Sequence, residues 1–154
     1  MRPADPADAQ RLWEWANDPL VRRWAFAQGA IPWETHQAWF ASRIADPNTR
    51  IFLGFDGTMP IGQVRFEGDD HAVEISVSVA ERARGRGFGA AIVDAAVRRL
   101  FGESGVDRVV ARLRHGNTAS EKLFEAASFD SEGEGSDGPL TWVQYARSRD
   151  AESP

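Results

Sequence analysis

Two neighbouring stretches of the sequence decide the fold. They are Val73-Glu74-Ile75-Ser76-Val77-Ser78-Val79 and Arg84-Gly85-Arg86-Gly87-Phe88-Gly89. The first alternates branched apolar residues with polar ones, which is typical of a half-buried β-strand. The second opens a segment with apolar residues at positions 88, 92, 96, 97 and 100, a spacing that predicts an amphipathic helix over residues 88–102. A glycine-rich loop therefore joins a strand to the start of a helix.

The flanking sequence supplies the other elements of an α/β domain. Towards the amino terminus we expect helices over residues 6–16, 20–27 and 32–45, and then strands over residues 50–55 and 61–66 that form a hairpin around Asp56-Gly57. Towards the carboxyl terminus we expect a strand over residues 106–113, a helix over 117–127 and a closing strand over 140–146. The prediction is a single-domain mixed sheet, antiparallel at its amino-terminal side, with helices on both faces.

Composition limits the kind of protein. The 154 residues, 42% hydrophobic and 27% charged, suit one globular domain. The chain has no cysteine, which excludes disulfides, thiolate zinc sites and cysteine nucleophiles, and its three scattered histidines suggest no metal site. A net charge of −5 disfavours nonspecific binding to nucleic acid. The sequence has neither a long apolar run nor a signal-peptide layout, so we expect a cytoplasmic protein without a membrane partner.

The glycine-rich loop is the feature that carries chemistry. A helix amino terminus presents unpaired N–H groups and a partial positive charge, and glycines allow a phosphate to approach them. Arg84 and Arg86 add two cations, which favours a diphosphate. The alternative is a flexible turn. The loop matches neither the GxGxxG dinucleotide pattern nor a P-loop, so nucleotide hydrolysis is disfavoured.

Two motifs make the chain resemble the GNAT superfamily of acetyl-CoA-dependent N-acetyltransferases. Its fingerprint, Arg or Gln, two residues, Gly, one residue, then Gly or Ala, is matched by Arg84, Gly87 and Gly89. A second family segment is matched by Asn117, Ser120, Phe124 and Phe129. The resemblance implies an N-acetyltransferase that uses acetyl-CoA as co-substrate and no metal.

The resemblance also implies positions for acetyl-CoA. The pyrophosphate would lie at Arg84, Gly85, Arg86, Gly87 and Gly89. The pantetheine arm would pair with the backbone of Val77 and Val79 and contact Asn117, for which a helix N-cap is the structural alternative.

The amino-terminal half suggests a narrower resemblance, to the acetyltransferases that modify amino-sugar nucleotides in pseudaminic acid biosynthesis. It rests on segments including Asn17-Asp18-Pro19, Ile31-Pro32-Trp33-Glu34, Asp46-Pro47-Asn48 and Ile61-Gly62-Gln63-Val64-Arg65-Phe66. The acceptor would then be the 4-amino group of a UDP-linked sugar, attacked directly in a ternary complex. The alternatives are a protein N-terminal acetyltransferase of the ribosomal-protein type and a silent acetyl-CoA-binding module that serves as a sensor or as the inert half of a fusion protein.

Glu74 is the candidate general base, because it is a polar residue in the strand that leads into the loop. It would deprotonate the acceptor ammonium through a water molecule if its side chain is partly buried. Ser76 and Ser78 share its face and could bind substrate. The other possible bases are His36, beside three tryptophans, and His71, while His115 is expected nearer the cofactor.

The acceptor site is expected near the amino-terminal helices. Trp24 could stack on a uracil or sugar face, with Trp33 and Trp39 as further candidates. Arg22, with Arg23, could receive the acceptor's diphosphate, although both could equally be solvated charges.

Three features depart from the family pattern. The position of the usual Tyr acid is Phe124, and the single tyrosine is Tyr145. The usual Gly before the final Phe is Ser128, which concerns only a local turn. The third is the first strand, which we expect to be truncated because the chain begins at Met1-Arg2-Pro3.

We expect the domain to extend over residues 1–147. Within it, residues 130–139 are expected to form a mobile acidic loop. After it, residues 148–154 are expected to form a flexible tail.

Overall fold

A seven-stranded sheet forms the centre of the structure. The computed structural model describes residues 1–27 and 29–152. The strands are β1 (Arg2–Pro3), β2 (Thr49–Asp56), β3 (Met59–Gly68), β4 (Ala72–Val79), β5 (Arg108–Arg114), β6 (Asp130–Asp137) and β7 (Leu140–Ser148). They lie in the order β1-β2-β3-β4-β5-β7-β6, and only the β4–β5 pair is parallel. The predicted mixed sheet, antiparallel on its amino-terminal side, is confirmed.

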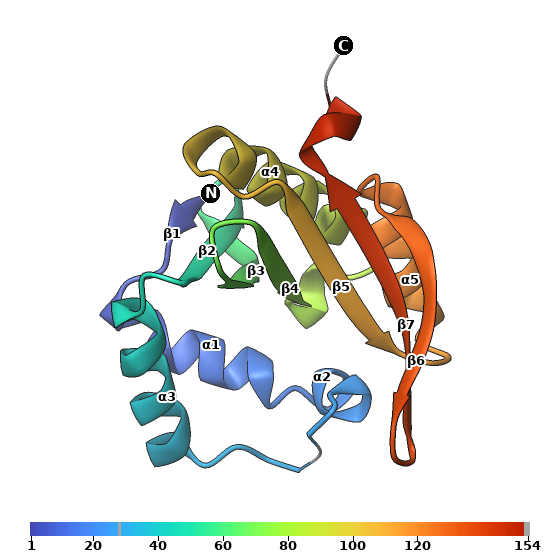
Figure 1. Cartoon of the computed structure of the whole chain (residues 1–154). Coiled ribbons are helices and arrows are strands. Elements are labelled where there is room, and N and C mark those ends of the chain that lie inside the picture. The colour runs from blue at the N-terminus through green and yellow to red at the C-terminus, as the bar shows by residue number, and fades with distance from the viewer. Residues whose placement is uncertain (28, 153–154) are drawn as a thin grey trace.

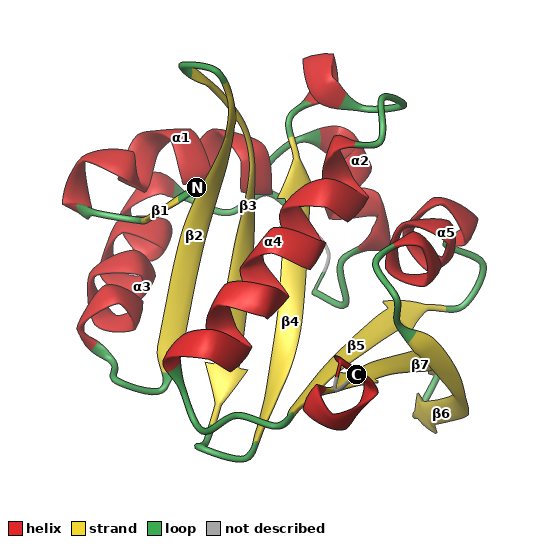
Figure 2. Cartoon of the chain, turned by 90° about the horizontal axis from the view of Figure 1, so that it is seen from above, coloured by secondary structure: helices red, strands yellow, loops and turns green. Residues whose placement is uncertain are grey.

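Helices cover both faces of this sheet, as the sequence predicted (Figures 1 and 2). Helices α4 (Phe88–Glu103) and α5 (Thr118–Ala126) lie on one face, and α1 (Ala9–Ala16), α2 (Pro19–Trp24) and α3 (Trp33–Ala45) lie on the other. Short 3₁₀ helices span Pro6–Asp8, Glu81–Ala83 and Arg149–Glu152. No helix in the described ranges combines the length and the apolar character that a membrane crossing requires.

The two faces bury separate hydrophobic clusters because successive side chains of a strand point to opposite sides. On the α4 face, Val64 and Phe66 of β3 belong to the same cluster as Val93 and Val97. On the other face, Leu53 of β2 packs with Leu12 and Phe40 of the amino-terminal helices. One amphipathic sheet therefore holds both helical layers.

The parallel pair β4–β5 is unusually short. Only Ala72–Glu74 of β4 and Arg108–Val110 of β5 are paired. Beyond them β4 stays paired with β3 as far as Val79, and β5 stays paired with β7 as far as Arg114. Each strand follows its own antiparallel neighbour, so a gap opens between their carboxyl ends.

The prediction of a mobile acidic loop over residues 130–139 is wrong. Residues Asp130–Asp137 form β6, which pairs antiparallel with β7 at the edge of the sheet. Its side chains are nearly all exposed, so the segment has no alternation of apolar residues to reveal a strand. Backbone pairing with β7 stabilises it instead.

The two ends of the chain are also tied to the sheet. Arg2 and Pro3 pair with Leu53 and Phe52 of β2, so the first strand is present with two residues. The predicted flexible tail, residues 148–154, is corrected over its described part: Ser148 belongs to β7, and Arg149–Glu152 form a 3₁₀ helix. Residues 153 and 154 lie outside the described residues.

Arg149 fixes this tail to the end of α4. Its guanidinium donates to the carbonyl oxygens of Phe101, Ser104 (2.7 Å) and Val106 (2.5 Å). The first two carbonyls belong to the last turn of α4 and the residue after it, where helix carbonyls lack intrahelical partners. We expect Arg149 to stabilise the carboxyl end of α4.

Replacing Arg149 with alanine should lower the free energy of unfolding by about 2 kcal/mol, because several carbonyls lose a charged donor. Denaturant titration measures this. Arg98→Ala is the matched control: Arg98 also forms a salt bridge, with Asp94, but its side chain is 64% exposed, so its loss should change stability by no more than about 0.5 kcal/mol. Equal effects of the two substitutions would contradict a role for Arg149 in holding the tail.

Candidate active site

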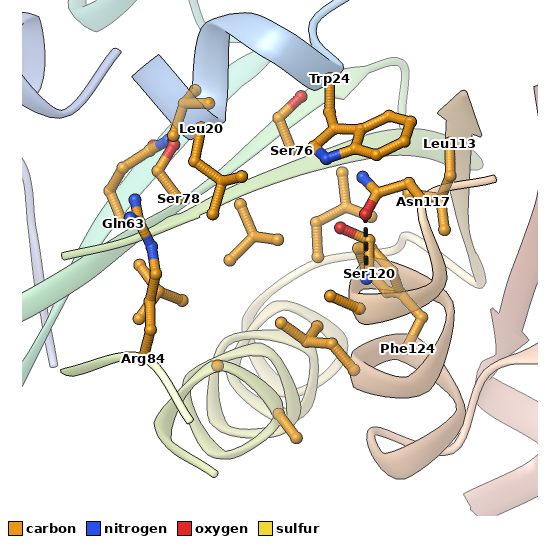
Figure 3. A pocket seen from close by; sticks show the side chains of 18 of the residues that line it. Leu20, Trp24, Gln63, Ser76, Ser78, Arg84, Leu113, Asn117, Ser120 and Phe124 are labelled. Atoms are coloured by element: carbon orange, nitrogen blue, oxygen red, sulfur yellow. Dashed lines mark hydrogen bonds between the residues drawn. The ribbon is translucent and has the colours of Figure 1, made fainter. Parts of the chain in front are cut away.

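A cavity of about 870 Å³ occupies the gap between β4 and β5. The carboxyl half of β4 lines it on one side, the end of β5 and α5 line it on another, and the loop before α4 closes its floor. Helix α2 contributes Leu20, Val21 and Trp24. Figure 3 shows Arg84 and Asn117 on opposite sides of the cavity, with the Trp24 indole beside Asn117.

The glycine-rich loop reaches the cavity, and two of its glycines have a clear structural reason. Gly87 is the N-cap of α4 with φ +78°, and a Cβ there would point into open space. Gly89 is packed so closely that a Cβ would collide with the side chain of Leu123 and lie 3.2 Å from Cγ2 of Val79. The open space at Gly87 leaves room for an anion at the amino terminus of α4, where unpaired N–H groups favour anion binding.

The cations of this loop have different surroundings. Arg84 lines the cavity, and its Nη2 lies 3.1 Å from Oδ1 of Asp18. Burial acts to raise the pKa of Asp18, but hydrogen bonds from the Leu20 backbone and from Arg84 outweigh it and lower that pKa. Asp18 also caps α2, because it accepts from the Leu20 N–H at 2.9 Å. Arg86 differs from expectation: it is exposed, lies over the Phe88 ring and is not a lining residue.

The second motif lines the cavity from α5. Asn117 is buried and caps α5, since its Oδ1 accepts from the Ser120 N–H at 3.3 Å. The N-cap alternative is therefore correct, and the same side chain also faces the cavity. Ser120 and Phe124 follow one and two turns along the lining face. Ser128 has φ +67°, the left-handed conformation that glycine adopts without strain.

The sheet contributes a row of polar side chains. Ser76 and Ser78 of β4 lie opposite Arg65 and Gln63 of β3, and all four line the cavity. Nη2 of Arg65 donates to Oγ of Ser76 at 3.3 Å, and Nε2 of Gln63 donates to Oγ of Ser78 at 3.2 Å. Glu74 lies on the same face and also lines the cavity, but it is exposed, so the partial burial that was a condition of its role as a base is absent.

Several cavity residues were missed in the sequence. Gln63 and Arg65 alternate along β3, and Arg112 and Arg114 alternate along β5, out of phase with the buried Val109, Ala111 and Leu113. Alternation placed these side chains on a face, but not next to the gap. The parting of β4 and β5, which no local pattern encodes, makes that face part of a cavity.

The three histidines do not meet in the cavity. His36 is buried among Trp33, Trp39 and Phe40, and its Nε2 lies 2.9 Å from the carbonyl oxygen of Ala9. Burial lowers the pKa of His36, which suits a neutral packed ring. His71 and His115 are exposed, and none of the three is a lining residue. Within the described residues, no three His, Cys, Asp or Glu side chains are grouped to hold a metal.

Only some of the aromatic and basic side chains that were expected at the acceptor site line the cavity. Trp24 and Arg22 line the cavity. Trp33 and Trp39 instead pack against His36, and Arg23 lies over the Trp24 ring with its Cζ 5.4 Å from the centroid. Of the three candidate tryptophans, the structure brings Trp24 to the cavity.

Tyr145 does not replace the missing tyrosine of the motif. Its hydroxyl is 3.0 Å from Oε1 of Glu125 and 3.3 Å from Oε1 of Glu121, and none of these three residues lines the cavity. Burial, with the hydrogen bond to Glu125, raises the pKa of Tyr145 to about 12. Phe124, at the motif position, is 1% exposed and packs edge-on against Phe129.

The cavity is strongly basic although the whole chain carries a net charge of −5. Among the described residues, its charged lining comprises Arg22, Arg65, Arg84, Arg112, Arg114, Lys122 and a single carboxylate, Glu74. Such a cavity attracts an anionic ligand. A diphosphate at the α4 amino terminus and an extended chain along the open edge of β4 would both fit it.

Comparison with known proteins agrees with this geometry. The acetyltransferase (GNAT) domain family matches residues 1–130. A similar protein is the L-2,4-diaminobutyric acid acetyltransferase of Streptomyces avermitilis, 31% identical over 124 residues, which are 78% of this chain and 64% of that protein. The chain thus spans somewhat less than two thirds of this relative.

Similar folds occur in solved structures. The aminoglycoside acetyltransferase AAC(6')-Ib with coenzyme A and kanamycin has a TM-score of 0.83, 21% identity and coverage of 97% of this chain and 94% of that one. The spermidine N-acetyltransferase of Vibrio cholerae with CoA and spermine has a TM-score of 0.85, 16% identity and coverage of 97% and 94%. Because the family match extends over most of the sheet and both cavity motifs, the chain belongs to the GNAT acetyltransferase family.

Proposed function

We propose that the protein is an acetyl-CoA-dependent N-acetyltransferase that acts on a primary amine. The observation that carries the proposal is the gap between β4 and β5, with the glycine-rich amino terminus of α4 at its end. A diphosphate and a long thioester-bearing arm match this combination of an anion site and an open strand edge. Family membership supports the same reading.

The chain's own groups suit each part of acetyl-CoA. The N–H groups at Gly87 and Gly89 and the guanidinium of Arg84 would hold the pyrophosphate. The edge of β4 from Val77 to Val79, which has no pairing with β5, would pair with the pantetheine amides. A backbone N–H there would stabilise the negative charge that develops on the thioester oxygen. Gly85 and Asn117 complete this half of the cavity.

The acceptor must lose a proton before it attacks. Glu74 remains our candidate for taking it, through a water molecule because its side chain is exposed. Glu74 is the single carboxylate of the described cavity lining, which is why we retain it for this role although its side chain is exposed.

The departing thiolate needs less assistance than a departing amine. A thiol has a pKa of about 8.5, so the sulfur can leave as an anion. Phe124 offers no proton, and Tyr145 lies away from the cavity lining. We therefore propose turnover without a dedicated tyrosine acid, rather than a domain that only binds acetyl-CoA.

Two acceptor classes agree with the sequence and the cavity. One is the 4-amino group of a UDP-linked amino sugar, for which Trp24 offers a stacking surface and Arg22 and Ser76 offer polar contacts. The other is a diamino acid, the class named for the Streptomyces relative. A protein amino terminus is the remaining alternative, and a panel of these amines assayed by release of free CoA would separate the three. A cytoplasmic location stays a prediction.

Gly87→Val should weaken binding of acetyl-CoA at least about tenfold, because the new side chain would occupy the space in front of the α4 amino terminus. Calorimetry measures this. Gly57→Val is the matched control, since Gly57 has φ +61° and equally open space but lies in the β2–β3 turn. Undiminished affinity in Gly87→Val, or an equal loss in the control, would place the cofactor elsewhere.

Glu74→Gln should lower kcat about a hundredfold at pH 7, the lower end of a general base's contribution, and much less at pH 9, where more of the acceptor is already free amine. Steady-state rates at the two pH values measure the difference. Glu103→Gln, an exposed carboxylate at the far end of α4, is the control. A loss of the same size at both pH values would indicate a binding role for Glu74.

Phe124→Tyr should change kcat by less than about tenfold, or about 1.4 kcal/mol of barrier, because the thiolate leaves without a tyrosine acid. Phe129→Tyr, at the partner ring that does not line the cavity, controls for the cost of a buried hydroxyl. A hundredfold gain in Phe124→Tyr alone would show that the natural chain lacks a needed acid and would favour the binding-module alternative.

A further inference from the structure

We propose that the acceptor carries an anionic group, a carboxylate or a phosphate, beside its reactive amine, and that Arg65 and Arg112 bind this group. The inference rests on the proposed function and narrows its substrate class. It excludes polycations such as polyamines and aminoglycosides as the preferred acceptors. Basic side chains on the two sides of the cavity carry this proposal.

Four of the six basic residues in the described lining form two groups. Arg84 lies in the loop before α4, and Lys122 lies on α5, so both are on the side where acetyl-CoA is proposed to bind. Arg65 and Arg112 belong to strands on either side of the gap, β3 and β5, and lie on the opposite face of the sheet from α4. Binding of the cofactor's phosphates would therefore leave Arg112 without a counter-charge, and Arg65 with Glu67 alone.

Arg65 is held in a fixed position. Its Nη2 donates to Oγ of Ser76 at 3.3 Å, its Nε lies 2.7 Å from Oε1 of Glu67, and its Cζ lies 4.9 Å from the centroid of the Trp39 ring. The Nε contact lacks the angle of a hydrogen bond. In the described residues Nη1 has no hydrogen-bond partner, so the guanidinium keeps donors for a ligand. A rotamer fixed in advance reduces the entropy that binding must overcome.

Arg112 supplies the cation on the other strand. It lies over the ring of Trp142 in β7, with its Cζ 5.7 Å from the centroid, and it is an exposed residue of the cavity lining. Within the described part of the chain it forms no salt bridge. Stacking on indole orients the guanidinium without neutralising it.

The same face carries few carboxylates. A polycation needs several carboxylates, and Glu74 is the only one in the described lining. Glu67, which follows Arg65 on the same face of β3, is already beside that arginine. One carboxylate for the reacting ammonium, flanked by cations for an attached anion, matches an amine that carries its own negative charge.

Matched pairs of acceptors test this preference. L-2,4-diaminobutyrate is compared with 1,3-diaminopropane, which lacks the carboxylate, and a UDP-linked 4-amino sugar is compared with the free 4-amino sugar. Spermidine and kanamycin complete the panel. We expect kcat/KM to be at least about tenfold higher for the anionic member of one pair. The pair that shows the difference distinguishes a carboxylate from a phosphate.

Variants then assign the effect to the two arginines. Arg112→Gln and Arg65→Lys should raise KM for the anionic acceptor about tenfold and leave kcat nearly unchanged, because they weaken ground-state binding. Arg112→Glu should reduce or reverse the ratio of kcat/KM for the anionic acceptor to kcat/KM for its matched acceptor without the anion. Arg98→Gln, an exposed arginine of α4 outside the lining, should change neither. Thermal unfolding of each variant separates a loss of binding from a loss of the fold.

A binding measurement distinguishes failure of this inference from failure of the proposed function. Calorimetry of the same acceptors with the CoA-bound protein requires no turnover. Tighter binding of the anionic members without acetyl transfer would support the inference and refute catalysis. Equal or better use of spermidine or kanamycin, or a preference that Arg112→Glu leaves intact, would overturn the inference while the N-acetyltransferase stands.

Discussion

The functional architecture depends on one constraint: β4 and β5 share only three residue pairs before each follows its antiparallel neighbour. A fully paired sheet would bring the two strands about 4.8 Å apart along their length and leave no space between them. Because they part at Glu74, the edge of β4 becomes available, and side chains of β3 and β5 line one cavity. Helix α4 starts at the end of the same gap. Helix α2 lies across it, joined to the loop before α4 by the Asp18–Arg84 salt bridge.

The charge of the cavity is opposite in sign to the net charge of the chain. The protein is acidic overall, yet arginines of β3, β5, α2 and the glycine-rich loop meet in the cavity. Several acidic residues lie instead on β6, where Glu132 pairs with Arg108 and the side chains are almost all exposed. A local field of this kind attracts anionic ligands, while the net negative charge repels nucleic acid.

Packing explains how the chain accommodates its departures from the family motifs. Phe124 fills its place by stacking edge-on against Phe129, and Tyr145 is held by Glu121 and Glu125. Ser128 takes a left-handed backbone conformation in the turn between α5 and β6, where its own N–H donates to the Glu125 carbonyl oxygen at 3.1 Å. These differences change which groups can supply a proton in the cavity.

The sequence by itself determined the elements and the family. Period-2 alternation predicted β4, helical spacing predicted α4, and the glycines between them predicted the anion site, because these patterns reflect local geometry and burial on one face. It did not reveal β6, whose stability comes from backbone pairing with β7, nor the packed tail, which depends on Arg149 reaching carbonyls more than 40 residues away. Tertiary structure alone decided that Arg65 and Arg112 face one cavity, that His36 is packed in the core and that Glu74 is exposed. These properties follow from how separate strands part and how helices cover them, which depends on contacts between residues distant in sequence.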